Sequence, residues 1–295
     1  MNSKVILYVA IGMSIFGFIV LATGLKMGAK PVVAIGNKQS GGSRELIKES
    51  IELSKFDELD VDIASIGTYI EQGDSYRLEY QAYEDNVPKI TENNDKLTVK
   101  QPSHSTFRFG VDFSGDDEQY YRIIVPEDAG VLDVDLDAAS GLISVDSVNI
   151  DGKVDIASGL VQIKNVESKE LKVAAASGKV ELENITTKKL KLDLSSGMMN
   201  VDNCTTKDLD AELTSGTMTF DRMTFDKADL DESSGKIELN VVGTKDDYSY
   251  DIEATSGSIK IDGNSVGKSY KTDGDKDKEI KADMTSGSLD ITFSE

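Results

Sequence analysis

The stretch AAASGKVELENI, residues 174–185, has near copies on both sides of it. VDIASGLVQIKNV precedes it by 19 residues, and KLDLSSGMMNVDNC follows it by 19. Every copy contains the pair Ser-Gly, and the serines of these pairs are Ser140, Ser158, Ser177, Ser196, Ser215, Ser234, Ser256 and Ser286. A nearly fixed period of about 20 residues indicates one supersecondary unit per repeat, stacked on its neighbours.

Apolar residues occupy three fixed positions in all eight repeats. In the central copy they are Val173, Val180 and Leu182, which lie four residues before, three after and five after Ser177. A spacing of two within each half is the period of a β-strand. Each repeat is therefore predicted to hold two short strands with a Ser-Gly corner between them. The fold class that follows is all-β: a single-stacked parallel β-solenoid with coils of about 19 residues.

The Ser-Gly corner has a structural explanation. If the alternation continues through the corner, the serine also points inward, where stacked hydroxyls can hydrogen-bond along a ladder. Glycine follows because a sharp corner often requires a positive φ, which is unfavourable for residues with a Cβ. We therefore expect these serines to build corners rather than to act as nucleophiles.

The two ends of the repeat region are expected to differ. Residues 53–130 are predicted to form an irregular β-rich part that caps the first coil, and residues 131–295 the regular solenoid. An uncapped solenoid end exposes unpaired backbone and favours edge pairing. The last stretch, LDITFSE, reads as a strand with nothing after it. This C-terminal coil is thus predicted to be an open end available for self-association.

The first 25 residues contain a membrane-anchor candidate. Residues 5–25 carry no charged side chain, and as a helix they would span about 31 Å, the thickness of a bilayer core. We predict a short N-terminal tip and a transmembrane helix over 1–25, with the lipid bilayer as the partner of residues 5–25, and a polar linker over 26–52. A cleaved signal peptide fits less well because the run is long and no A-x-A-like site follows. The lysines and arginine after the run outnumber those before it, which by itself favours a cytoplasmic domain.

Composition excludes several classes of function. The formal net charge is −21, with 53 Asp and Glu against 32 Lys and Arg. Such an acidic chain is unsuited to nucleic acid, whose phosphates require clustered Lys and Arg. A single cysteine, Cys204, cannot form an internal disulfide.

Candidates for chemistry are few. His104 is the one histidine and is interpreted as a surface residue, and Cys204 falls on an apolar column and is interpreted as a small buried hydrophobe. One His and one Cys supply no Ser-His-Asp or Cys-His set. The loop TDGDKDKE, residues 272–279, departs from a calcium-binding EF-hand at the positions that need Gly and Glu. We expect no catalytic residue and no cofactor, with weak divalent-cation binding as the open alternative.

An acidic column is the most distinctive feature of the predicted outer surface. It lies three residues before each serine and consists of Asp137, Asp155, Asp193, Glu212, Asp231, Glu253 and Asp283, with Ala174 as the exception. Stacked one per coil, like charges about 5 Å apart repel each other. The column keeps a β-rich protein soluble, or it forms a stripe that binds divalent cations or a cationic polymer of the envelope.

The run PEDAGVLDVDLDAASGLISVDSV, followed by the Ser-Gly repeats, resembles the putative-adhesin family of bacterial envelope proteins, including its Lia-type membrane-anchored members. The resemblance covers roughly residues 50–295. It implies a β-solenoid domain, often behind an amino-terminal membrane segment, and it offers no catalytic residues.

Three functional hypotheses follow. The leading one is a non-enzymatic, single-pass membrane protein whose C-terminal domain is extracellular and serves adhesion or envelope structure, by binding envelope polymers or surface proteins. The alternative is a cytoplasm-facing, membrane-tethered scaffold that self-assembles through the solenoid end. The third is an enzyme that uses carboxylates in a groove, which short coils with few loops make the least favoured.

Overall fold

The structure is a computed structural model, and it describes residues 30–34, 45–102, 107–112, 119–272 and 276–294. The chain divides into two compact units, Met1–Leu46 with Ser103–Glu118 and Ile47–Pro102 with Gln119–Glu295. In the first unit, strand β1 (Lys30–Ala34) pairs antiparallel with β8 (Phe107–Asp112). All other described strands belong to the second unit or begin at its boundary.

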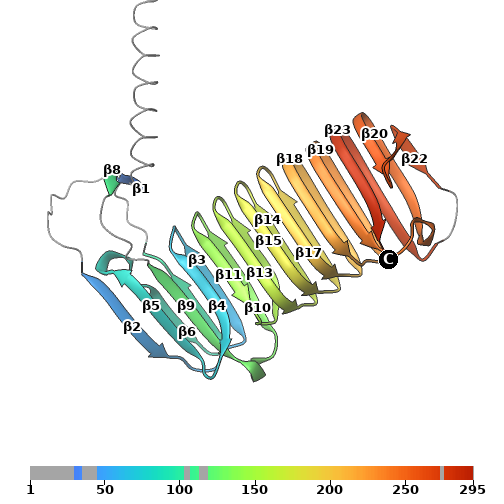
Figure 1. The fold of residues 1–295 in the computed structure, drawn as a ribbon. Coiled ribbons are helices and arrows are strands. Elements are labelled where there is room, and N and C mark those ends of the chain that lie inside the picture. Colours follow the sequence, from blue (N-terminus) through green and yellow to red (C-terminus); the bar gives the residue numbers. More distant parts are fainter. Residues whose placement is uncertain (1–29, 35–44, 103–106, 113–118, 273–275, 295) are drawn as a thin grey trace, which may run out of the picture. The chain divides into compact units, whose positions relative to one another are not determined.

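The second unit is a stack of parallel coils, each with one strand in each of two sheet layers (Figure 1). Layer 1 contains β3 (Glu58–Ile63), β7 (Lys96–Lys100), β10 (Leu132–Ala138), β12 (Ile150–Ile156), β14 (Glu170–Ala175) and β16 (Lys189–Leu194). Layer 2 contains β4 (Gly67–Gly73), β9 (Tyr120–Pro126), β11 (Leu142–Asp146), β13 (Leu160–Glu167), β15 (Lys179–Thr186) and β17 (Met198–Thr205).

Four longer strands run through the corner and contribute to both layers. They are β18 (Asp208–Met223), β19 (Lys227–Val242), β20 (Tyr248–Ile261) and β23 (Lys278–Ser294). The register confirms the predicted period, because Val154 pairs with Val173 and Val173 with Leu192, each one coil further along the chain. The expected all-β fold with a long parallel sheet is therefore present, and it is consistent with a β-solenoid.

The predicted apolar columns form the core. All 24 residues of the three columns are buried, including Val173, Val180 and Leu182 of the central repeat. They belong to a single continuous cluster that runs the length of the stack. Since each residue packs on its counterpart in the next coil, burial of apolar area is repeated once per coil and stabilises the stack additively.

The prediction that the repeat serines point inward is wrong. Ser177 is exposed, like most of its counterparts, because the strand alternation ends two residues earlier at buried Ala175. The backbone then turns, and Gly178 has a φ of 126°. A Cβ at Gly178 would also overlap the carbonyl oxygen of Gly159 in the preceding coil. Glycine is thus required both by the backbone conformation and by the close stacking of the corners.

A second bend occurs within layer 2, at an asparagine that the sequence analysis did not single out. Asn165, Asn184 and Asn203 occupy equivalent positions and have φ values of 56°, 56° and 53°. Asparagine tolerates this left-handed conformation better than most residues that carry a Cβ. Each bend turns the chain so that the residue after it, such as Ile185, is again buried.

Antiparallel strands cover the N-terminal end of the stack. Strand β6 (Lys89–Asn93) pairs with β7 in layer 1, and β5 (Arg77–Tyr83) pairs with β9 in layer 2. Strand β2 (Leu46–Glu52) pairs in turn with β5. The remaining regular elements of this end are the 3₁₀ turns η1 (Glu84–Asn86) and η2 (Glu127–Ala129).

At the C-terminal end, the order of the coils in the stack differs from their order in the sequence. Strand β23 does not form an open end, because it lies between β19 and β20 and pairs in parallel with both (Figure 1). The outermost coil is β20, and β21 (Asn264–Gly267) and β22 (Ser269–Lys271) pair antiparallel with parts of it. The turn η3 (Lys245–Asp247) connects β19 to β20. The idea that β23 offers a free edge for self-association is therefore wrong.

The predicted anchor at residues 5–25 lies outside the described residues. Within the described ranges, the structure contains no helix of the length and apolarity needed to cross a membrane. The stretch 26–52, predicted to be a linker, contains the strands β1 and β2. The proposed domain boundaries stay predictions.

Candidate functional site

The acidic column forms one continuous row on the outside of layer 1. Its residues are register partners from coil to coil, in the spatial order Asp137, Asp155, Ala174, Asp193, Glu212, Asp231, Asp283 and Glu253. We call this the acidic row. The structure thus brings together all seven predicted residues, with the last two in the reverse of their sequence order because β23 lies inside β20.

Lysines neutralise the first part of the row. Lys153 Nζ lies 3.0 Å from Asp135 Oδ1 and within 4 Å of carboxylate oxygens of Asp137 and Asp155. Lys191 Nζ lies 3.0 Å from Glu212 Oε1 and also contacts Asp193 and Asp210. These lysines occupy the neighbouring outward column, so each one bridges carboxylates of adjacent coils.

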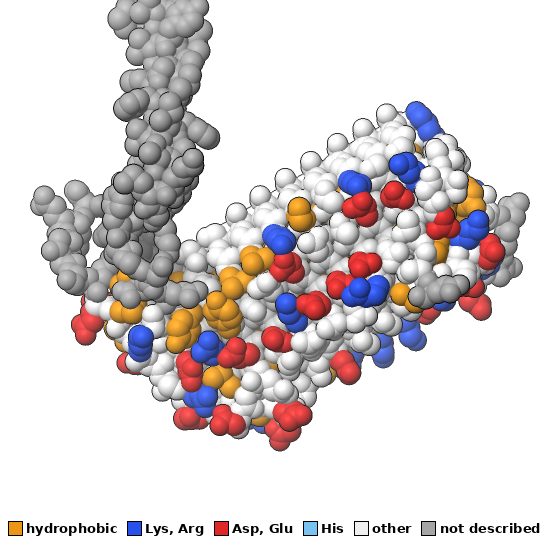
Figure 2. Space-filling view, in the orientation of Figure 1, with side chains coloured by type: hydrophobic (Ala, Val, Ile, Leu, Met, Phe, Trp, Pro, Cys, Tyr) orange, Lys and Arg blue, Asp and Glu red, His pale blue; other side chains and the backbone are white. Residues whose placement is uncertain are grey.

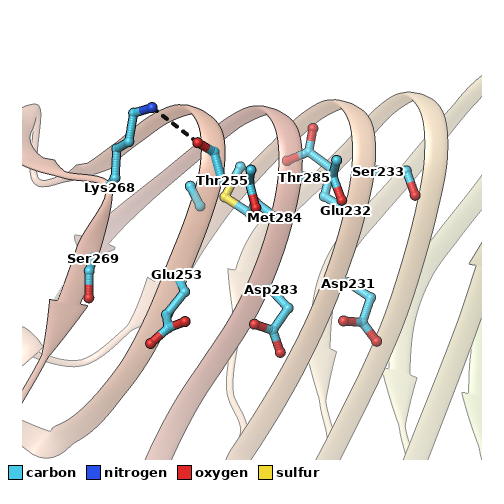
Figure 3. Close-up of a pocket in the computed structure, with 11 residues that line it drawn as sticks. Asp231, Glu232, Ser233, Glu253, Thr255, Lys268, Ser269, Asp283, Met284 and Thr285 are labelled. Atoms are coloured by element: carbon cyan, nitrogen blue, oxygen red, sulfur yellow. Dashed lines mark hydrogen bonds between the residues drawn. The ribbon is translucent and has the colours of Figure 1, made fainter.

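The C-terminal part of the row differs, because no ion pair of the described residues involves Asp231, Asp283 or Glu253. Figure 3 shows their carboxylates on three adjacent strands, pointing to the same side. They line a groove of about 640 Å³ together with the hydroxyl-bearing corner residues Ser233, Thr285 and Thr255. We call this the acidic groove.

Lys268 forms the rim of the acidic groove without neutralising it. Its Nζ donates a hydrogen bond to the carbonyl oxygen of Thr255 over 3.0 Å, at the end of the groove away from the carboxylates (Figure 3). The neighbouring residue Ser269 belongs to β22, so the strand that covers β20 also closes one side of the groove.

The electrostatics of the groove favour a cationic ligand. Burial raises the pKa of the Asp231 carboxyl, and the neighbouring carboxylates of Asp229 and Asp283 raise it further. Repulsion of this kind is relieved by a positive charge bound beside the row. No group of three or more His, Cys, Asp or Glu within the described ranges is arranged to hold a metal ion.

Glu232 is an unexpected residue beside this groove. It lies on the inward column two residues before the serine, where its counterparts are apolar, and it is only 3% exposed. In Figure 3 its carboxylate points away from the three acidic residues, toward the corner of β23. Neither carboxylate oxygen has a hydrogen-bond partner of good geometry among the described residues. Burial raises its pKa, while the backbone amides of Ser288 and Gly235 act in the opposite direction.

The other candidates from the sequence were Cys204, His104 and the loop 272–279. Cys204 is 1% exposed, as predicted, and burial raises the pKa of its thiol to about 12. A thiol in this state is a poor nucleophile. His104 lies outside the described residues, as does part of the loop 272–279. On the face shown in Figure 2, acidic and basic side chains intermingle along the stack, and hydrophobic side chains gather toward its N-terminal end.

A coiled parallel stack with a Ser-Gly corner in every repeat defines a class of β-repeat proteins. The chain matches the family model described as Toastrack DUF4097 over residues 56–292, and it belongs to this family. No curated protein sequence matches the chain.

Several solved structures are similar to this chain. A protein described as a putative adhesin from Bacteroides fragilis has 16% sequence identity and a TM-score of 0.49, with 85% of this chain and 98% of that chain covered. A second putative adhesin, from Parabacteroides merdae, has 13% identity and a TM-score of 0.47, covering 85% and 97%. A putative lipid binding protein from Parabacteroides distasonis has 13% identity and a TM-score of 0.33, covering 86% and 98%.

Proposed function

We propose that this protein is a non-enzymatic, membrane-anchored cell-surface protein that binds cationic groups of envelope polymers or surface proteins through its acidic groove, and so serves adhesion or envelope structure. The observation that carries the proposal is the set of three carboxylates, Asp231, Asp283 and Glu253, which share one groove and have no ion pair among the described residues. The carboxylates outnumber the single lysine at the rim, Lys268, and a groove with such an excess of negative charge concentrates cationic ligands.

The anchoring part of the proposal depends on residues 5–25, whose uncharged run is long enough to span a bilayer. Its test is protease treatment of intact cells that carry the chain with a C-terminal tag. Loss of the tag, while cytoplasmic control proteins survive, is the expected result. Protection of the tag, with the purified protein shown to be cleavable between residues 26 and 52, would overturn the surface location and favour the cytoplasm-facing alternative.

The binding part is tested with a fluorescent lysine oligomer as a cationic probe. The triple variant D231N/D283N/E253Q is expected to weaken binding at least tenfold, and wild-type binding should fall as salt rises because the attraction is electrostatic. The matched control is E84Q/D85N/E127Q, which removes the same formal charge from exposed residues outside the row. Equal losses in both variants would show that only the overall net charge attracts the probe, and that the groove has no binding role.

A non-enzymatic function is supported by the chemistry of the side chains. The sequence has one histidine and one cysteine, and the cysteine is buried with a raised pKa. The carboxylates of the groove lie on one open surface, and the described residues that line it include no histidine or cysteine. The described residues of the groove therefore supply no histidine- or cysteine-based pair for nucleophilic catalysis.

A further inference from the structure

Strand β23 occupies an unusual place in the stack. In the preceding coils, strands that follow each other in the chain are direct neighbours, as β12, β14 and β16 are. Strands β19 and β20 are also consecutive coils, yet β23, which comes later in the chain, separates them. The corner serines show this order, since Ser234 pairs with Ser286 and Ser286 pairs with Ser256.

The same register makes a direct β19–β20 pairing geometrically consistent. Leu239 pairs with Ile291, and Ile291 pairs with Ile261, so all three residues lie on one inward column. If β23 were absent, β20 could move one strand spacing toward β19 and keep every apolar side chain facing the core. The stack would then have the arrangement of its preceding coils. Two arrangements of these strands therefore satisfy the same pattern, as in proteins that insert a strand into a sheet.

The interface between β19 and β23 contains a destabilising residue, the buried Glu232. Glu232 of β19 is buried against the corner of β23, where a Cβ at Gly287 would overlap its Oε1. Its register partner on β23 is Met284, and the equivalent residue on β18 is Leu213. A buried carboxylate without a partner of good hydrogen-bond geometry disfavours the packed state, so it lowers the free energy needed to separate β23 from β19.

We propose that β23 is an exchangeable strand, which can leave its own stack and insert between β19 and β20 of a second copy of this chain. An exchanged β23 makes the same pairings as the original one, and residues 272–277, which follow β22, connect it to the donor molecule. This interaction differs from association through an exposed edge, because the incoming strand enters the interior of a stack. Because Asp283 lies on β23, an exchanged strand supplies this carboxylate to the acidic groove of the other copy, and the exchange goes beyond the proposed function.

The test uses cross-linking between two variants of the full chain in detergent micelles. Glu238 of β19 and Asp290 of β23 are register partners. A copy carrying E238C is mixed with a copy carrying D290C, and a short thiol-specific cross-linker is added at intervals. Native Cys204 stays unmodified because it is buried and its pKa is raised to about 12. A single chain carrying both substitutions should cross-link within itself. This result would show that β23 keeps its native pairing with β19 in the variants.

The expected result is a covalent dimer of E238C and D290C chains that accumulates with time. The matched control mixes E238C with T219C, since Thr219 and Glu238 are register partners but neither lies on β23. Introducing E232M, which places the residue type of Met284 at position 232, should slow dimer formation severalfold. The proposal is overturned if the doubly substituted chain cross-links internally while the E238C and D290C mixture yields no more dimer than the control mixture.

Discussion

Asn184 donates a hydrogen bond from its Nδ2 to the Oδ1 of Asn165, one coil earlier, over 2.9 Å. Asn203 extends this ladder by donating to Asn184 over 2.6 Å, and Asn165 donates in turn to Asp146. Each asparagine also has a positive φ. One residue type thus supplies both the bend in layer 2 and a bond between coils, so the two contributions can be separated by substitution.

Replacing Asn184 with alanine is expected to lower the free energy of unfolding by about 2 kcal/mol. About half of this loss comes from placing alanine, whose side chain forms no local hydrogen bond, at a positive φ. The rest comes from the hydrogen bonds of the asparagine ladder that are lost. N184G removes the ladder but suits the backbone, so it should lose only about 1 kcal/mol. Urea unfolding of the two variants measures the difference. Equal losses would show that the φ of residue 184 does not limit stability.

Gly178 is expected to tolerate no side chain. G178A places a methyl group against the backbone of Gly159 in addition to the strain of a φ of 126°, so the loss should exceed about 2 kcal/mol. G263A is the matched control, because Gly263 has a φ of 73° and no atom lies within 4 Å of the position that a Cβ would take there, so it should lose only about 1 kcal/mol. Thermal unfolding of both variants compares steric contact with backbone strain. A G178A chain as stable as G263A would contradict the close stacking of the corners.

Lys153 is expected to stabilise the acidic row in a salt-dependent way. Its hydrogen bond to Asp135 raises the pKa of its ammonium group, so its contribution is present at neutral pH and is lost only when the pH rises above the ordinary range of lysine. The side chain is 41% exposed, so solvent screening limits the effect of K153Q to about 0.5 kcal/mol at low salt. The difference in unfolding midpoint should shrink in ~1 M salt. K188Q, on an exposed lysine without an ion pair among the described residues, should change neither value.

The apolar columns and the acidic row could be predicted because both repeat with the period of the coil. The inward orientation of the serines was predicted wrongly, since alternation holds only while the backbone stays extended and the strand ends at Ala175. The order of the last coils was also missed. The apolar positions of a repeat are the same whichever coil it packs against. The sequence pattern therefore does not reveal that β23 lies between β19 and β20.

Two signals in the sequence pointed to these exceptions. The Ser-Gly intervals lengthen to 22 and 30 residues at Ser256 and Ser286. In this part the chain first forms the outermost coil, β20, and then returns to place β23 between β19 and β20. The position two residues before each serine is apolar in the other seven repeats and glutamate at 232. A polar residue on an inward column marks a local conflict between pattern and packing, and such conflicts are often functional.

Glu232 is expected to make the stability of the stack depend on pH. Its carboxyl lies beside Gly287 and the backbone amide of Ser288 on β23. Its register partners are Leu213 of β18 and Met284 of β23, and the carboxylates of Asp231 and Asp283 belong to the acidic row on the outside of layer 1. No cationic side chain of the described residues pairs with it.

Since burial raises the pKa of Glu232 in the folded state, the folded state binds the proton more tightly than the unfolded chain does. This contribution to stability is complete below the ordinary pKa of glutamate and is lost as the pH rises through the raised value. E232M should therefore be more stable than the wild type by about 1–3 kcal/mol at pH ~7.5, with a smaller difference at pH ~4. E253Q, which neutralises an exposed glutamate on β20, is the control for the removal of one charge. Urea midpoints at the two pH values measure the effect, and an E232M chain less stable than the wild type at the higher pH would show that the buried carboxylate is well accommodated by the amides of Gly235 and Ser288.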